Sequence, residues 1–130
     1  MTEVLLVDDD PLMRELLAEW LSEAGYCVRQ ADNGDSALQM LCDQPVGVLV
    51  TDMDMPGCNG AQMLAEVREA WPGMPVIAIS GGARGGKANW AATAIKLGAA
   101  KTLYKPFEKK ELLASVKEIL GTWRARTNRP

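Results

Sequence analysis

Histidine is absent from all 130 residues of the sequence. Without an imidazole, the chain cannot carry out Ser-His or Cys-His nucleophilic catalysis, and it cannot build a histidine-ligated metal site. Any step that needs a histidine must therefore use one from a partner protein.

Cysteine is scarce and poorly spaced for a structural role. Cys27, Cys42 and Cys58 are an odd number of thiols, and no two of them form a CxxC pair. Such spacing favours neither a disulfide framework nor a zinc site. We interpret the three residues as buried or incidental thiols.

Long apolar runs and a strong net charge are also missing. No run approaches the ~20 apolar residues of a membrane span, and the first residues do not resemble a signal peptide. The net charge of −3 argues against direct nucleic acid binding through charge alone. With 48% hydrophobic residues, the composition predicts one soluble, cytoplasmic domain over residues 1–122, followed by a basic, frayed tail over residues 123–130.

The most informative stretch of the sequence is Val46–Gly60. Val46–Asp52 is rich in β-branched apolar residues, as is typical of a strand buried on both faces, and it ends in a carboxylate. The turn-forming residues of Pro56–Gly60 follow and place Asp52 at a loop. A buried strand that ends in an acid is a common way for an open α/β sheet to build a binding site.

Apolar, strand-like runs alternate with amphipathic, helix-like stretches five times along the chain. The predicted strands are Glu3–Val7, Tyr26–Ala31, Val46–Asp52, Pro75–Ser80 and Lys101–Tyr104. The predicted helices are Pro11–Ala24, Asp35–Cys42, Asn59–Trp71, Lys87–Leu97 and Glu108–Leu120. The first of them has Asp10 as its cap and an apolar stripe that includes Leu12 and Leu16. This alternation predicts an α/β fold, with a five-stranded parallel sheet flanked by five helices.

Polar residues stand at the carboxyl ends of four predicted strands. Asp8 and Asp9 follow the first strand, Asp52 ends the third, Ser80 ends the fourth and Lys105 follows the fifth. If the first strand lies beside the third, three carboxylates meet in one crevice. Two carboxylates ~4 Å apart repel by roughly 4 kcal/mol at an effective dielectric of 20, so we expect a divalent cation, and oxygen ligands favour Mg²⁺.

These groups match the needs of phosphoryl transfer. Negative charge builds on the equatorial oxygens of the transferred group, and a cation, the Lys105 ammonium and the Ser80 hydroxyl can stabilise it. Asp52 is then the nucleophile that attacks in line and becomes an acyl phosphate. Phosphorylation changes the charge of Asp52 from −1 to about −2.

Four short motifs in the right order resemble the receiver domain of bacterial response regulators, and the resemblance covers residues 3–121. The motifs are Asp8-Asp9, the Thr51–Gly57 segment with Gly60, Ile79–Gly81, and Tyr104–Phe107. The resemblance implies a flavodoxin-like fold with strand order 2-1-3-4-5. It also implies a signalling switch, not an enzyme with an external product, whose phosphoryl donor is a histidine kinase or a histidine phosphotransfer protein.

The resemblance also assigns roles to single residues. Asp52 is the phosphoacceptor, and Mg²⁺ is held by Asp9, Asp52 and the backbone carbonyl of Asp54, with Asp8 acting mainly through water. By the same resemblance, Ser80 is the switch hydroxyl and Lys105 is the lysine shared by the family.

The sequence departs from the family pattern at three places. The position of the usual switch aromatic holds Thr102, and Tyr104 lies on the same strand face. The Gly81–Gly86 loop is longer and richer in glycine than in the chemotaxis-type receivers. Asp54 is an acid at a variable position, where it should influence the lifetime of the acyl phosphate.

We expect a stand-alone switch, because no output domain fits after residue 121. The signal is expected to leave through the fourth helix, the fifth strand and the fifth helix, where Thr102, Tyr104 and Trp90 lie. The oligomeric state is predicted as a monomer or a phosphorylation-dependent dimer. The main alternative is a receiver fragment of a larger transcriptional regulator.

Two other classes of protein remain open as alternatives. The Asp52-x-Asp54 pair after a buried strand resembles the nucleophile and the general acid of haloacid-dehalogenase-type phosphatases. The segment Gly81–Ala88 fits the phosphate-cradling GxxxxGK[ST] pattern of nucleotide triphosphatases except at Ala88, which has no hydroxyl for Mg²⁺.

Overall fold

The computed structural model describes residues 2–53, 60–80 and 95–127. In chain order, the elements are β1 (Glu3–Val7), α1 (Pro11–Glu23), β2 (Cys27–Ala31), α2 (Gly34–Asp43), β3 (Val48–Asp52), α3 (Gly60–Ala70), β4 (Val76–Ser80), β5 (Lys101–Tyr104) and α5 (Lys109–Thr127). β1 and β5 have the predicted bounds, and the other strands differ from the prediction by one or two residues at their amino ends.

The strands form one parallel sheet in the order β2-β1-β3-β4-β5, so the predicted topology is confirmed. The chain moves outward from β1 to β2, then returns past β1 to β3 and continues to β5. The order therefore reverses between β1 and β3. In open parallel sheets, ligands bind at the carboxyl ends of the strands beside such a reversal.

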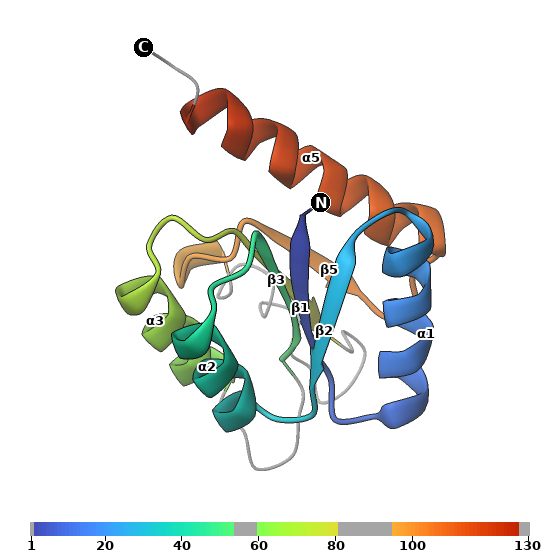
Figure 1. Ribbon diagram of the computed structural model, residues 1–130, viewed down its shortest axis with the longest axis horizontal. Helices are drawn as coiled ribbons and strands as arrows, with labels where there is room; N and C mark the ends of the chain where they lie inside the picture. Colours follow the sequence, from blue (N-terminus) through green and yellow to red (C-terminus); the bar gives the residue numbers. More distant parts are fainter. Residues whose placement is uncertain (1, 54–59, 81–94, 128–130) are drawn as a thin grey trace.

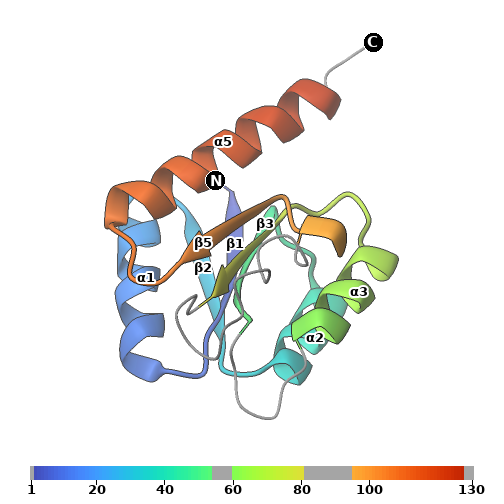
Figure 2. The same cartoon turned by 180° about the vertical axis from the view of Figure 1, so that it is seen from behind.

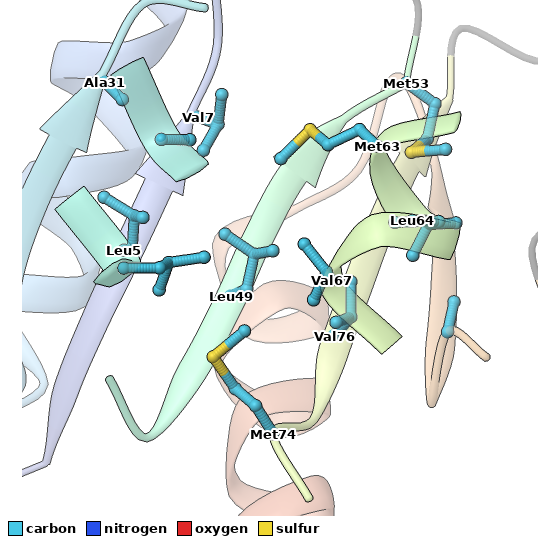
Figure 3. Close-up of a cluster of buried hydrophobic side chains, with 14 residues drawn as sticks. Leu5, Val7, Ala31, Leu49, Met53, Met63, Leu64, Val67, Met74 and Val76 are labelled. Atoms are coloured by element: carbon cyan, nitrogen blue, oxygen red, sulfur yellow. The ribbon is translucent and has the colours of Figure 1, made fainter. Parts of the chain in front are cut away.

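Helices cover both faces of the sheet, with α1 and α5 on one face and α2 and α3 on the other (Figures 1 and 2). Under α2 and α3, side chains such as Leu5, Leu49, Leu64 and Val67 form one buried apolar cluster (Figure 3). The alternate residues of the same strands, such as Leu6, pack with α1 and α5 in a second cluster. Since both faces are covered, every residue of β3 is buried, as its continuous apolar pattern predicted.

The apolar stripe predicted for α1 is wrong at its amino-terminal end. Leu12 is 79% exposed and Leu16 is 41% exposed, whereas Leu17, Ala18 and Leu21 are buried. The helix places one narrow stripe against the sheet, and a period of 3.6 residues puts Leu12 and Leu16 outside that stripe. The predicted stripe also held Leu17, Trp20 and Leu21, so the prediction identified the helix and its buried Leu17 and Leu21 correctly and was wrong for Leu12 and Leu16.

The last helix is longer than predicted. α5 continues past the predicted end at Leu120 to Thr127, so most of the tail expected to be frayed is helical. Gly121 does not end the helix because it is not among the residues with a positive φ, which a glycine cap requires. The carboxyl-terminal part of α5 extends beyond the sheet in both views (Figures 1 and 2).

The fourth predicted helix, Lys87–Leu97, lies mostly outside the described residues. Its visible end, at residues 95–96, is helical and stops before Gly98, which has a φ of +108°. Within the described ranges the sheet is flanked by four helices. None of these helices has both the length and the apolar character needed to cross a lipid bilayer.

Two of the three cysteines lie in the described residues, and both are free and exposed. Cys27 begins β2 and Cys42 lies near the end of α2, and both are exposed. Of the two alternatives, buried or incidental thiols, the exposure of these two residues favours the second. Cys58 lies outside the described residues.

Candidate functional site

The acidic cluster is built by two neighbouring strands. β1 and β3 pair so that Val7 lies opposite Thr51, which brings Asp8, the first residue after β1, beside Asp52, the last residue of β3. One carboxylate oxygen from each of Asp8, Asp9 and Asp52 lies within 4.8 Å of the other two. Asp8 and Asp52 are 1% and 4% exposed, while Asp9 is exposed. The predicted convergence of three carboxylates is confirmed.

The loop between β1 and α1 is held by hydrogen bonds within the loop and by one to the end of β2. Asp10 caps α1, since its side chain accepts from the backbone N–H of Leu12 and of Met13. Asp8 Oδ1 accepts from the N–H of Asp10 at 2.9 Å, and the Asp8 N–H donates to the Ala31 carbonyl of β2 at 3.1 Å. The helix cap and the strand end together present the acidic pair to the cluster.

Lys105 brings the positive charge from the far side of β4. It directly follows β5, and its Nζ lies 3.0 Å from Asp52 Oδ2 and 3.8 Å from Asp8 Oδ2. Its backbone N–H donates to the carbonyl of Ser80, the buried last residue of β4, at 2.8 Å. The peptide bond between Lys105 and Pro106 is cis. The lysine therefore spans the end of β4 to reach the acids of β1 and β3.

The positive charge at the cluster does not balance the negative charge. Three carboxylates meet one ammonium among the described side chains, and Asp8 Oδ2 is buried without a hydrogen-bond partner. Burial raises the pKa of Asp8, and the charges of Asp52 and Asp9 raise it further, while the Asp10 N–H and the Lys105 ammonium lower it. A buried carboxylate oxygen that accepts no hydrogen bond, and that lies 3.8 Å from the one ammonium and beside two other carboxylates, fits an oxygen-ligated divalent cation.

The other residues of the predicted site have mixed outcomes. Ser80 pairs in register with Tyr104, which is 42% exposed, and Thr102 is half-buried on the same strand. Asp54 and Trp90 lie outside the described residues, as do the Gly81–Gly86 loop and the GxxxxGK-like segment. The roles predicted for all these residues stay predictions.

One residue beside the site was missed at the level of sequence. Arg14 donates from a guanidinium nitrogen to the backbone carbonyl of Asp8 at 2.8 Å. The only signal in the sequence is a lone arginine one turn into a helix that starts directly after the acids. That pattern is equally typical of a surface residue, so the sequence did not single it out.

The sequence matches the response regulator receiver domain family over residues 4–117, and the chain belongs to that family. Receiver domains are signalling domains that accept phosphoryl groups from histidine kinases, and phosphorylation on aspartate and Mg²⁺ binding are general features of the family. This membership favours the switch over both the phosphatase and the nucleotide triphosphatase.

Relatives of two kinds are found. The response regulator protein FleR of Pseudomonas aeruginosa is 35% identical over 111 residues, which are 85% of this chain and 23% of FleR. The response regulator receiver protein CpdR of Brucella abortus is 33% identical over 125 residues, which are 92% of this chain and 98% of CpdR. The chain spans only 23–26% of the length of FleR and of several transcriptional regulators that it also matches.

Solved structures agree with the family assignment. The receiver domain of NtrX from Brucella abortus superimposes with a TM-score of 0.85 at 33% identity, and the match covers 92% of this chain and 98% of that domain. The fold described above is thus a receiver fold in its detailed arrangement as well as in its strand order.

Proposed function

We propose that this chain is a phosphorylation-activated switch in which Asp52 accepts a phosphoryl group from a histidine kinase or a histidine phosphotransfer protein. The observation that carries the proposal is the position of the Asp52 carboxylate, which lies 3.0 Å from the Lys105 ammonium and within 4.8 Å of the carboxylates of Asp8 and Asp9. A nucleophilic carboxylate, an acidic pair and an ammonium are the groups that phosphoryl transfer to aspartate requires.

In the proposed reaction, a carboxylate oxygen of Asp52 attacks the phosphorus atom. A new O–P bond forms, the P–N bond of the donor phosphohistidine breaks, and the imidazole stays with the donor. The Lys105 ammonium already donates a hydrogen bond to Asp52 and would then donate to the phosphoryl oxygens. The hydroxyl of Ser80, at the end of β4, would donate to the same oxygens. The chain catalyses only its own phosphorylation and dephosphorylation.

Asp8, Asp9 and Asp52, with the backbone carbonyl of Asp54, would hold Mg²⁺. The cation, when bound, neutralises the phosphoryl oxygens and offsets the repulsion between the carboxylates. The Oδ2 of Asp8 supports this assignment, because it is buried, accepts no hydrogen bond in the described part of the chain and shares the single Lys105 ammonium with Asp52. A buried carboxylate oxygen in such a position is costly unless further positive charge compensates for it.

The proposed output surface consists of the predicted fourth helix, Lys87–Leu97, together with β5 and α5, and it includes Thr102, Tyr104 and Trp90. The exposed ring of Tyr104 stands directly beside Ser80 in the sheet register, which joins this surface to the phosphoryl site. A coupling of ~1–3 kcal/mol between Asp52 and this surface would change the affinity for a partner 5–150-fold.

We further propose a cytoplasmic receiver over residues 1–122 that works alone, as a monomer or a phosphorylation-dependent dimer, and has no direct nucleic acid binding. The match to nearly the whole of CpdR supports this form. The alternative, a receiver that belongs to a larger transcriptional regulator, is supported by the much longer relatives. Sequencing the reading frame on both sides of these residues distinguishes the two.

The experiment that tests the phosphorylation site is an intact-mass measurement. The protein is incubated with Mg²⁺ and a small acyl phosphate, and one phosphoryl group is expected on the wild type and none on Asp52→Asn. Repeated turnover of an external phosphoester would instead favour a phosphatase. A phosphoryl group that persists on Asp52→Asn would overturn the assignment.

A further inference from the structure

Arg14 connects three elements beside the acidic cluster. It lies at the end of the first turn of α1, and its side chain is half-buried. Its Nη1 donates to the backbone carbonyl of Asp8 at 2.8 Å, and its Nε donates to Oε1 of Gln30, on β2, at 3.2 Å. The planar guanidinium therefore links the loop after β1 to a helix and to the neighbouring strand.

The carbonyl that Arg14 holds belongs to the peptide unit between Asp8 and Asp9. This unit is planar, so fixing its oxygen also fixes the direction in which the chain continues toward Asp9. On the other side of Asp8, the backbone N–H is bound to the Ala31 carbonyl at 3.1 Å. The backbone of Asp8 is thus anchored at both its donor and its acceptor.

Asp9 depends on this backbone more than Asp8 does. Asp8 Oδ1 is held by the N–H of Asp10, whereas the Asp9 carboxylate is exposed and accepts no hydrogen bond from any residue in the described ranges. The carboxylate of Asp9 is therefore aimed at Asp8 and Asp52 by the main chain.

We propose that Arg14 is a positioning residue for the divalent cation: it holds the Asp8–Asp9 peptide so that the carboxylates of both residues converge with that of Asp52. This inference rests on the proposed function, because it requires the acidic cluster to bind a cation. Partners that orient metal ligands without touching the metal typically change metal affinity by about 10–100-fold.

Because Arg14 is positively charged, the direction in which its replacement changes the cation affinity distinguishes a positioning role from a charge effect. A guanidinium near the cluster repels a divalent cation, so if charge alone mattered, its removal would strengthen cation binding. If Arg14 acts by positioning, its removal weakens binding despite that lost repulsion. The two effects have opposite signs.

The test is a calorimetric titration of Mg²⁺ into the wild type, Arg14→Gln and Arg14→Lys. We expect the dissociation constant of Arg14→Gln to rise about tenfold. Arg14→Lys keeps the positive charge but loses the planar guanidinium that donates to two acceptors at once. We expect this variant to bind Mg²⁺ less tightly than the wild type. Arg29→Gln is the matched control, because Arg29 Nη1 also donates to a backbone carbonyl, that of Gln44, at 3.0 Å; its Mg²⁺ affinity should equal that of the wild type.

A second measurement follows phosphorylation by a small acyl phosphate at increasing Mg²⁺ concentrations. Arg14→Gln should need about tenfold more Mg²⁺ for half of its maximal rate, and its rate at saturating Mg²⁺ should approach that of the wild type. A general loss of folding would lower the rate at every Mg²⁺ concentration.

The outcomes separate this inference from the proposed function. If the wild type binds Mg²⁺ and Arg14→Gln binds it equally or more tightly, the positioning role is wrong and the switch stands. If the wild type binds no divalent cation, the proposed function fails first. If Arg14→Gln does not fold, Arg14→Lys and Gln30→Ala decide, and wild-type affinity in both overturns the inference.

Discussion

Lys101 and Lys105 stand at the two ends of β5, and their surroundings differ. At the amino end of the strand, Lys101 forms an ion pair with Glu118 of α5, and these side chains are 34% and 65% exposed. At the carboxyl end, Lys105 reaches two buried aspartates, Asp8 and Asp52, and one oxygen of Asp8 remains without a hydrogen bond.

The difference shows which end of the sheet serves stability and which serves function. A solvated ion pair contributes little free energy and is stable as it stands. A buried excess of negative charge destabilises the fold until a cation, a proton or a ligand compensates for it. Buried carboxylates that destabilise the fold in this way cluster at functional sites. This contrast favours the carboxyl end of the sheet, and not the amino end, as the proposed site.

The largest effect is expected when the lysine at the carboxyl end is removed. Lys105→Ala deletes the ammonium that contacts Asp52, and phosphorylation by a small acyl phosphate should slow on the order of 100-fold. Lys101→Ala, on the same strand, is the matched control and should keep the wild-type rate. Equal losses in the two variants would show that the two ends do not differ. The measurement is the rate of the mass increase at saturating Mg²⁺.

The second effect concerns the cost of the buried acid. Asp8→Asn keeps the acceptor for the Asp10 N–H and removes a buried charge, so the free energy of unfolding without divalent cations should rise by about 1–3 kcal/mol. Saturating Mg²⁺ should reduce this advantage, because a bound cation stabilises the wild type. Urea unfolding in a chelator and in Mg²⁺ measures both. A variant less stable than the wild type in the chelator would contradict the prediction.

The third effect is a pH dependence with a defined sign. Burial raises the pKa of Asp8 above its ordinary value of 3.8. At a pH between 3.8 and the raised pKa, the folded chain binds more protons at Asp8 than the unfolded chain does. The stability that protonated Asp8 contributes to the fold is therefore fully present below pH 3.8 and is lost as the pH rises through the raised pKa. The wild type should therefore lose stability relative to Asp8→Asn as the pH increases. Urea unfolding across this range in a chelator tests it, and a difference independent of pH would contradict it.

The smallest effect is expected at the amino end. Glu118→Gln breaks the pair with Lys101, and the free energy of unfolding should fall by at most about 1 kcal/mol, less in high salt. Mg²⁺ affinity and phosphorylation should not change. A loss well above this bound in urea unfolding, or a weaker Mg²⁺ affinity, would show that the amino end is coupled to the site.

Much of the fold was readable from the sequence because its signals are local. β1 is followed by the acids before Pro11 and β5 by Lys105 and Pro106, residues that interrupt strands, and the bounds predicted for both strands are confirmed. Asp10 was recognised as a helix cap from its place before Pro11. Leu12 and Leu16 of α1 and the end of α5 were predicted wrongly, because the sequence does not show which side chains meet the sheet or whether Gly121 takes the positive φ of a helix cap.

The candidate site divides in the same way. The sequence by itself determined that Asp8, Asp9, Asp52, Ser80 and Lys105 stand at strand ends, since alternation and breakers locate those ends. The adjacency of β1 and β3 was expected only from the family resemblance, and the structure confirms it. Only the tertiary structure decided that Lys105 crosses the end of β4 and that Arg14 holds the Asp8 carbonyl. These contacts join residues through burial and strand order, and their geometry depends on the whole packed sheet, which no short stretch of sequence specifies.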